Sequence, residues 1–286
     1  MSALRLDPVE DAIAAIAAGA PVVVVDDEDR ENEGDLILAA SAATPALIGF
    51  AVRHSSGLLC APMSAARADA LELPLMVREN ADPLRTAYTV SVDAAEGVTT
   101  GISAADRART LQVLAGTGTA PTDLVRPGHV LPLRAKDGGV PERRGPTEAA
   151  VDPTRLAGLP AVGVIAETIG DLVHDDGETM RPPALRELAD RHALAMISIE
   201  DLAAHRRIHD RPALEITAPV PLPTSHGTFE ALAVREGTAE HLVLVRGDVT
   251  TAEPVLTRVH SECVTGDGCA ARRCDSIVAS SGSPAS

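Results

Sequence analysis

Aromatic side chains and cysteines are scarce in this chain. Its 286 residues include no Trp, one Tyr and two Phe, although 45% of the residues are hydrophobic. The core must therefore be built from Ala, Val, Leu and Ile. Cys60 stands alone, and the other cysteines, Cys263, Cys269 and Cys274, crowd the C-terminal segment. This distribution does not form a disulfide framework, so we expect a reducing, cytoplasmic location.

Positive charge is also in short supply. Lys and Arg number 25 against 41 Asp and Glu, which gives a formal net charge of −16. Nucleic acids and anionic membranes bind basic faces, so the charge balance argues against both as partners. A phosphorylated small molecule is compatible with it, because such a ligand needs only a local arginine pocket. No apolar run approaches the length of a membrane span, and we expect no signal peptide.

The most informative segment is the acidic sequence Asp26–Asp35, DDEDRENEGD, in which carboxylates surround Arg30. It directly follows the apolar run Val22–Val25 and precedes a second apolar run at 36–40, so it connects two core segments. Crowded carboxylates repel one another unless a cation neutralises them, and Mg²⁺ is the usual hard cation. A solvated acidic turn is the ordinary alternative. Gly34 favours a site, because glycine lets backbone approach a ligand closely.

Apolar runs and turn residues predict alternating helices and strands up to about residue 209. The sequences Asp7-Pro8-Val9-Glu10 and Ser103–Asp106 have the pattern of a capping box, which indicates two helix starts. Strands are predicted at 22–25, 88–93, 130–133, 162–166 and 195–199, and further helices at 46–52, 147–156, 183–192 and 201–207. A turn-rich segment is expected at 119–128. This alternation is typical of a layered α/β domain whose sheet is largely covered.

A second unit is predicted after residue 211. We place the two domains at 1–209 and 212–286. Short strands separated by Gly, Pro and Thr turns are expected at 231–234, 241–245 and 255–259, so the C-terminal unit is predicted to be a small, mainly β fragment.

Several motifs closely resemble the 3,4-dihydroxy-2-butanone 4-phosphate synthases of riboflavin biosynthesis. They are DDEDRENEGD, RHSSGLLC, TAYTVSVDA, GVTTGISAADRART, RPGHVLPLRA and TEAAVD. The resemblance covers roughly residues 5–209 and implies the α/β (α+β) layered sandwich of that family. It also implies a lyase that uses Mg²⁺ or Mn²⁺ to convert D-ribulose 5-phosphate into 3,4-dihydroxy-2-butanone 4-phosphate and formate. A homodimer with active sites at the subunit interface is implied as well.

The resemblance assigns roles to individual residues. Glu31 matches a metal ligand, with Glu33 close by, and Arg30 and Asp35 match contacts to the sugar. The implied catalytic residues are Glu31, Glu33, Asp35, His129 and Glu167, and the implied substrate-binding residues are Arg30, Glu31, Asp35, Arg143, Thr147 and Glu167. Removing protons next to a carbonyl requires positioned carboxylates and a cation that stabilises the enediolate.

The phosphate-binding assignment has a physical rationale, and the assignment of His129 has a simple alternative. Arg143 and Thr147 match the phosphate-binding pair, and a guanidinium beside a helix N-terminus suits a phosphate. The ordinary alternative for His129 is a loop residue that bonds to backbone.

One position departs from the family pattern. The family loop reads Arg-x-Gly-His-Thr, and its histidine is a ligand of the metals, whereas this chain has Pro146 before Thr147. Mg²⁺ tolerates a site of carboxylate, water and substrate oxygens, and His54 and His174 are candidate replacements. Pro146 leaves two alternatives open. One is a diverged paralogue that performs altered chemistry on a related ketose phosphate, and the other is a non-catalytic protein that binds a sugar phosphate or a sister subunit.

The C-terminal segment resembles GTP cyclohydrolase II. The sequence from Arg258 to Asp267, with Cys263, and the later Cys274 match that family's zinc motif, whose third cysteine position is here Ser276. Serine is a poor zinc ligand beside thiolates, so we expect no zinc there, unless the off-pattern Cys269 fills the position. Because the sequence ends at Ser286, we expect a truncated segment without cyclohydrolase activity, which is a remnant or an interaction surface.

Overall fold

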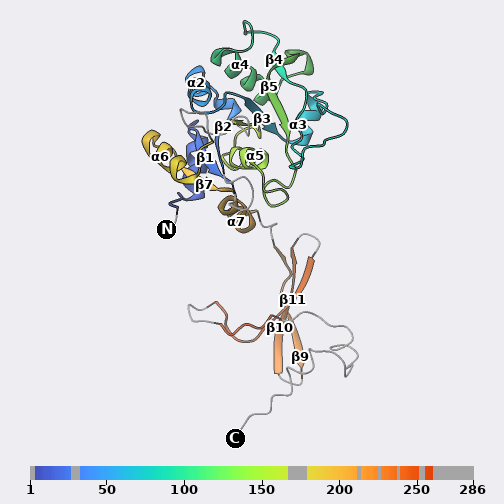
Figure 1. Ribbon diagram of the computed structural model, residues 1–286. Helices are drawn as coiled ribbons and strands as arrows, with labels where there is room; N and C mark the ends of the chain where they lie inside the picture. The colour runs from blue at the N-terminus through green and yellow to red at the C-terminus, as the bar shows by residue number, and fades with distance from the viewer. Residues whose placement is uncertain are drawn as a thin grey trace. The chain divides into compact units, whose positions relative to one another are not determined.

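The structure is a computed structural model that describes residues 4–26, 33–166, 179–210, 214–224, 227–236, 239–250 and 255–259. The chain divides into two compact units, Met1–Arg211 and Pro212–Ser286 (Figure 1). Each helix in the described part of the chain is too short or too polar to cross a membrane.

A seven-stranded mixed sheet organises the first unit. Its strands are β1 (Val22–Val25), β2 (Gly34–Ala39), β3 (Leu59–Met63), β4 (Val92–Ala94), β5 (Leu124–Arg134), β6 (Gly163–Ala166) and β7 (Met196–Ser198). They lie in the order β4-β5-β3-β6-β2-β1-β7. The pairs β1/β7 and β3/β5 are parallel, and the remaining neighbours are antiparallel.

Helices cover both faces of this sheet. They are α1 (Val9–Ala17), α2 (Pro45–His54), α3 (Ala65–Ala70), α4 (Ala104–Ala115), α5 (Pro146–Leu156), α6 (Pro182–His192) and α7 (Ile199–His209), with short 3₁₀ turns η1 (Ala40–Ala42) and η2 (Pro121–Asp123). Buried residues of α2, α3, α4 and α6 form one core with the sheet, and those of α1, α5 and α7 form the other. α5 packs against β3, β6 and β2, and Figure 1 shows it in yellow-green beside the sheet.

The uninterrupted apolar strands follow from this three-layer arrangement. Successive side chains of a strand point to opposite faces. Val23 and Val25 accordingly belong to the core under α2, α3, α4 and α6, while Val22 and Val24 belong to the core under α1, α5 and α7. A strand that is buried on both faces needs no polar alternation. The predicted layered α/β sandwich is confirmed.

The predicted cap of the first helix is wrong. α1 has Pro8 at its N-cap and no side-chain capping bond. Asp7 instead accepts hydrogen bonds from the Met196 amide at 2.8 Å and from the Arg186 guanidinium at 2.7 Å. These bonds tie the N-terminal segment to β7 and α6. A carboxylate forms a stronger hydrogen bond with a charged guanidinium than with a neutral amide at the start of a helix.

The predictions around β4 and β5 also need correction. Of the strand predicted at 88–93, only Val92 and Asp93 belong to β4, while Tyr88 and Thr89 form isolated bridges. β5 already begins at Leu124, inside the segment predicted to be turn-rich. The register of the β4/β5 pair shifts between Val92 and Asp93. Such a bulge accommodates proline and glycine within a strand. Sequence patterns assign these two residues to turns and therefore predict a turn at the start of β5.

The second unit is a small antiparallel sheet, as predicted. It contains β8 (Glu215–Ile216), β9 (Val220–Thr224), β10 (Gly227–Glu236) and β11 (Ala239–Val245), and β10 pairs with each of the other three. The prediction of a strand at 255–259 is wrong, because these residues form neither a helix nor a strand. Leu256 and Val259 are almost fully exposed there, so the segment lacks the burial that stabilises strands.

Asp106 organises the segment that leads into α4. The Ser103 hydroxyl accepts a hydrogen bond from the Asp106 amide at 3.0 Å, which confirms the predicted N-cap. The Asp106 carboxylate accepts bonds from the Thr99 amide, the Thr99 hydroxyl and the Gly101 amide at 2.9, 2.8 and 3.1 Å. These bonds, that of the Thr99 amide foremost, lower the pKa of Asp106 from 3.8 to about 2.

Asp106 should therefore make stability depend on pH in acid. Its folded-state pKa lies below the unfolded value, so its contribution is complete above a pH of about 4 and is lost as the pH falls through about 2. Asp106→Asn should lower the free energy of unfolding at neutral pH and have progressively less effect below a pH of about 4. Urea unfolding of both proteins at stepwise lower pH measures this difference. A difference that stays constant down to the lowest pH would contradict the assignment.

Candidate active site

Several strands of the first unit begin or end at one edge of the sheet. Val25 at the end of β1 lies opposite Gly34 at the start of β2, so the acidic segment connects the two strands at this edge. β6 ends at the same edge, because Ala166 lies opposite Leu36 of β2 and Leu59 of β3. The register thus brings together the acidic connection and the strand that precedes Glu167 in the sequence. Three predicted site residues, Arg30, Glu31 and Glu167, lie outside the described residues.

The described carboxylates of the acidic segment lie at the ends of β1 and β2. Asp26 donates its amide hydrogen to the Glu33 carbonyl at 3.0 Å. Glu33 Oε1 accepts a hydrogen bond from the Thr179 hydroxyl at 3.0 Å and lies 3.4 Å from an Arg181 nitrogen. Asp26 and Asp35 are only 7% and 6% exposed. Burying several carboxylates together is unfavourable without compensating positive charge, and their oxygens are the ligands that Mg²⁺ prefers.

The space beside Gly34 is taken by protein rather than left for a ligand. A Cβ atom at this position would lie 2.5 Å from Leu185 Cδ1 of α6. The glycine is therefore required by the packing of α6 against β2, which corrects the interpretation that it admits a ligand.

His129 lies in β5 and pairs with a carboxylate of β4. Its Nδ1 is 2.7 Å from Asp93 Oδ2, and its amide donates to Asp93 Oδ1 at 2.9 Å. Because Leu131 lies opposite Cys60 of β3, His129 reaches the same edge of the sheet as the start of β3. The alternative of a loop histidine bonded to backbone is wrong. In a neutral ring whose Nδ1 donates to the Asp93 carboxylate, Nε2 is left as the acceptor, which suits a proton-transfer role.

Gly101 is required beside this pair. Its φ is +92°, and a Cβ atom there would lie 2.1 Å from Asp93 Oδ2 and 2.5 Å from His129 Nδ1. The Gly101 amide is held by Asp106. The segment before α4 therefore packs its backbone directly against the Asp93–His129 pair.

Arg143 lies two residues before Gly145, the N-cap of α5, and a helix N-terminus favours an anion. Its Nη1 contacts Glu148 Oε2 at 2.6 Å, and its Nη2 donates to the Leu84 carbonyl at 3.1 Å. Glu148 is buried and also accepts a bond from the Lys136 amide at 2.9 Å. The guanidinium is therefore held in one position by Glu148 of α5 and by the loop that contains Leu84.

Thr147 is the second predicted phosphate-binding residue and occupies the first turn of α5. It is 1% exposed, and its hydroxyl oxygen has no hydrogen-bond partner among the described residues. A buried polar atom without a partner costs about 1–3 kcal/mol. A ligand oxygen at the helix N-terminus would supply the missing partner.

Pro146 fits its position without distorting the helix. It is the buried first residue of α5, where the N–H that proline lacks has no helical partner and its backbone angle suits the helix. It offers no side-chain ligand. Of the candidate replacements, His54 ends α2 shortly before β3 begins. Its ring packs in a tilted orientation against Phe50 and His192, with centroid distances of 4.5 and 5.1 Å. His174 lies outside the described residues.

A buried ion pair supports the segment that carries Arg143. Arg206 of α7 donates to Asp152 of α5 at 2.7 Å and to the Gly138 carbonyl at 2.8 Å. Asp152 also accepts a bond from the Val140 amide at 2.9 Å. Burial raises the pKa of Asp152 even though the Val140 amide and Arg206 act to lower it. Sequence reasoning missed Asp152, Arg206 and the partner of His129, because these contacts join residues far apart in the chain.

The fold and the carboxylate-rich edge define the class as an α/β sandwich protein with an acidic site at one sheet edge. Residues 10–205 match the family model described as 3,4-dihydroxy-2-butanone 4-phosphate synthase, and residues 215–280 match the model described as GTP cyclohydrolase II. The chain belongs to the 3,4-dihydroxy-2-butanone 4-phosphate synthase family.

Curated relatives agree with this family. The riboflavin biosynthesis protein RibBA of Nocardia farcinica is 54% identical over 273 residues, which is 95% of this chain and 65% of the relative. The protein of the same name from Salinispora arenicola is 54% identical over 269 residues, which is 93% of this chain and 63% of the relative. The chain thus spans a little under two thirds of the length of these relatives.

Solved structures resemble the chain as well. A crystal structure of 3,4-dihydroxy-2-butanone 4-phosphate synthase in complex with two magnesium ions has a TM-score of 0.68 and 46% identity, and the match covers 72% of this chain and 99% of that one. RibBX, a two-domain 3,4-dihydroxy-2-butanone 4-phosphate synthase from A. baumannii, also has a TM-score of 0.68, with 41% identity over 84% of this chain and 70% of its own.

Gly101→Ala should separate Asp93 from His129. Gly158→Ala is a matched control, because Gly158 also has a positive φ, +73°, but no atom within 4 Å of the added Cβ. The control should lose about 1–2 kcal/mol of unfolding free energy for the strained backbone. Gly101→Ala should lose a further 1–3 kcal/mol or so from overpacking. It should also shift the NMR signals of the His129 ring. Equal losses and an unshifted ring would contradict the placement of Gly101.

Thr147→Val should leave the fold intact while weakening anion binding. The hydroxyl it removes has no partner among the described residues, so the free energy of unfolding should stay the same or rise. Thr154→Val on the same helix is the control, because the buried Thr154 hydroxyl donates to the Ala150 carbonyl at 2.8 Å and its removal should cost about 1 kcal/mol. Thermal shifts with inorganic phosphate should fall only in Thr147→Val. Equal phosphate shifts in both variants would rule out Thr147 as a phosphate ligand.

Proposed function

We propose that the first unit is a lyase that converts D-ribulose 5-phosphate into 3,4-dihydroxy-2-butanone 4-phosphate and formate with Mg²⁺ or Mn²⁺. One observation carries this proposal. The register of β1, β2 and β6 brings the acidic connection and the strand before Glu167 to one edge of the sheet, which His129 also reaches. Membership of the synthase family supports it.

The donor set at this edge fits a hard divalent cation. In the proposed site Glu31 is the metal ligand, with Glu33 close by, and the buried Asp26 and Asp35 add negative charge. A bound cation would polarise the substrate carbonyl and stabilise the enediolate. Oxygen ligands suit Mg²⁺ and Mn²⁺.

The remaining predicted residues take distinct roles in the proposal. Arg30 and Asp35 bind the sugar, and Glu167 acts as the second catalytic carboxylate. His129, oriented by Asp93 through its Nδ1, offers Nε2 for proton transfer. In the neutral imidazole, the contact with Asp93 favours the tautomer that carries its proton on Nδ1.

Arg143 and Thr147 hold the phosphate in the proposed substrate complex. The contacts of Arg143 with Glu148 and the Leu84 carbonyl fix its guanidinium before substrate arrives, which reduces the entropy lost on binding. The first turn of α5 contributes its positive dipole end. A phosphate anchored there would hold the reacting carbons at a set distance from the anchor.

Pro146 is the reason for two alternative functions, a diverged paralogue and a non-catalytic binding protein. A diverged paralogue with altered chemistry on a related ketose phosphate could lack the family's histidine ligand. The 54% identity to RibBA of Nocardia farcinica over 95% of this chain favours the family reaction over that alternative and over a non-catalytic binding protein.

Formate release from D-ribulose 5-phosphate tests the proposal. The wild-type protein should release formate only with Mg²⁺ or Mn²⁺, and Glu31→Gln should be inactive with unchanged unfolding. Pro146→His, which restores the family's ligand, should raise the rate by up to about a hundredfold. Formate from Pro146→His alone would favour the diverged paralogue. Wild-type activity that persists with a chelator would contradict the role of the cation.

We also propose that the protein is a homodimer. Leu75, Met76 and Val77 are consecutive apolar residues that are 49%, 48% and 51% exposed in the single chain, which is typical of a surface that a partner covers. Light scattering should give twice the 29.5 kDa chain mass. Met76→Glu should shift the equilibrium toward the monomer. A wild-type monomer at assay concentration would contradict the proposal.

For the second unit we propose no zinc site and no GTP cyclohydrolase II activity of its own, because Ser276 stands at the third cysteine position of the motif. Absence of GTP consumption by the purified chain would agree with this, and zinc-dependent turnover of GTP would contradict it. The cysteine distribution leads us to propose a cytoplasmic location.

A further inference from the structure

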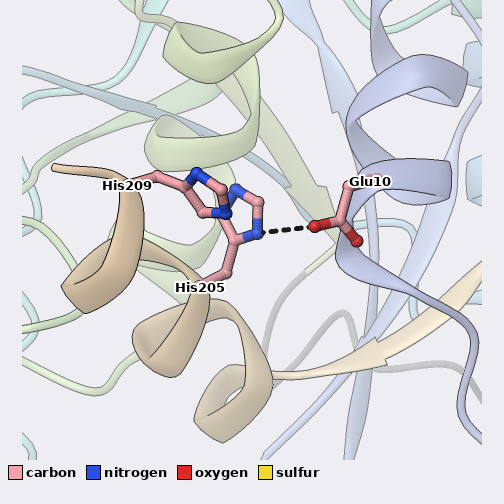
Figure 2. A group of neighbouring side chains, drawn as sticks. All are labelled: Glu10, His205 and His209. Carbon is pink, nitrogen blue, oxygen red and sulfur yellow. Dashed lines mark ion pairs between the residues drawn. The ribbon is translucent and has the colours of Figure 1, made fainter. Parts of the chain in front are cut away.

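Two histidines and a glutamate meet on the helical layer formed by α1 and α7. Figure 2 shows His205 and His209 of α7 with their rings side by side and the Glu10 carboxylate of α1 facing them. Glu10 Oε1 lies 3.1 Å from His205 Nδ1, and the two imidazole centroids are 4.1 Å apart. One ligand atom from each side chain lies within 4.8 Å of the other two. Among the described residues, no other trio of His, Cys, Asp or Glu meets this condition.

The backbone positions these three side chains on rigid elements. His205 and His209 are four residues apart on α7, so they lie on one face of the helix. α1 and α7 cover the same face of the sheet, and Ile16 of α1 shares a core with Leu202 of α7. Glu10 lies in the first turn of α1 and points toward α7 (Figure 2). The cluster thus joins elements near the beginning and the end of the first unit.

The ligand chemistry of this cluster differs from that of the acidic sheet edge. Two imidazole nitrogens and a carboxylate oxygen form the donor set that suits Zn²⁺, Co²⁺ and Ni²⁺, whereas an all-oxygen set suits Mg²⁺. Metal bonds of 2.0–2.1 Å or so place neighbouring ligand atoms roughly 3–3.5 Å apart. The Glu10–His205 contact already has this separation. Side-chain rotation of the exposed His209 would bring in the third nitrogen.

We propose that Glu10, His205 and His209 form a binding site for a transition-metal cation of the Zn²⁺, Co²⁺ or Ni²⁺ class, with water completing the coordination. The bound ion links α1 to α7. Since the unfolded chain does not hold the three ligands together, the ion binds the folded state and stabilises the first unit. Without a metal, Glu10 and His205 form an ordinary ion pair. This contact alone does not show a metal site, so metal binding itself has to be measured.

The test uses the full chain, stripped with a chelator and then saturated with Mg²⁺ so that the acidic sheet edge is occupied. Zn²⁺ at about a hundredfold excess over its dissociation constant should raise the Tm by roughly 5–10 °C. His209→Gln should abolish this rise. That variant keeps the Glu10–His205 ion pair, so loss of the metal effect could not be attributed to loss of the pair.

Co²⁺ titration separates this site from the C-terminal cysteines. Wild-type protein should bind one more Co²⁺ per chain than His205→Gln/His209→Gln, with the visible ligand-field bands reduced in the double variant. Any near-ultraviolet thiolate charge-transfer band from Cys263 and Cys274 should be the same in both. His241→Gln, which removes an exposed histidine of β11, is the control and should behave as wild type. Equal Co²⁺ stoichiometry and equal Zn²⁺ shifts in wild type and double variant would overturn the proposal.

Discussion

The pairing of β2 with β1 on one side and β6 on the other determines which parts of the chain meet at the proposed site. Because both pairs are antiparallel, the acidic connection between β1 and β2 and the end of β6 come to one edge of the sheet. A register shift of one residue would turn the carboxylates of this edge toward the opposite face. The close packing of both cores opposes such a shift, because Leu36 and Ile37, which are buried on opposite faces of β2, would exchange faces.

The rest of the first unit supports this edge from the two helical layers. Asp106 holds the segment that packs against Asp93 and His129, and Arg206 holds the segment that leads to Arg143. In each case a buried carboxylate, Asp106 of α4 or Asp152 of α5, forms the hydrogen bonds that hold the segment. Neither carboxylate is itself one of the predicted site residues. Preorganisation of this kind places polar groups before a substrate arrives, in a core built almost without aromatic side chains.

Much of the fold could be predicted from the sequence, because apolar strands such as Val22–Val25 and helix starts such as Ser103 have local signals. The predictions failed where long-range contacts override local ones: Asp7 binds Arg186 instead of capping α1, and the bulge beside Val92 lets β5 run through Pro127. Family motifs supplied the candidate site residues. They gave no role for Asp93 or Glu148, whose partners are set by the tertiary fold, and the roles of Glu31 and Glu167 stay predictions.

In the proposed site, the carboxylates at the sheet edge share one divalent cation with the substrate. Anomalous diffraction from crystals grown with Mn²⁺ and D-ribulose 5-phosphate tests it most directly. We expect an anomalous peak at the edge between β1, β2 and β6, about 2 Å from a Glu31 oxygen and from substrate oxygens. A peak confined to other residues, with the sugar phosphate bound at this edge without a metal, would contradict the claim.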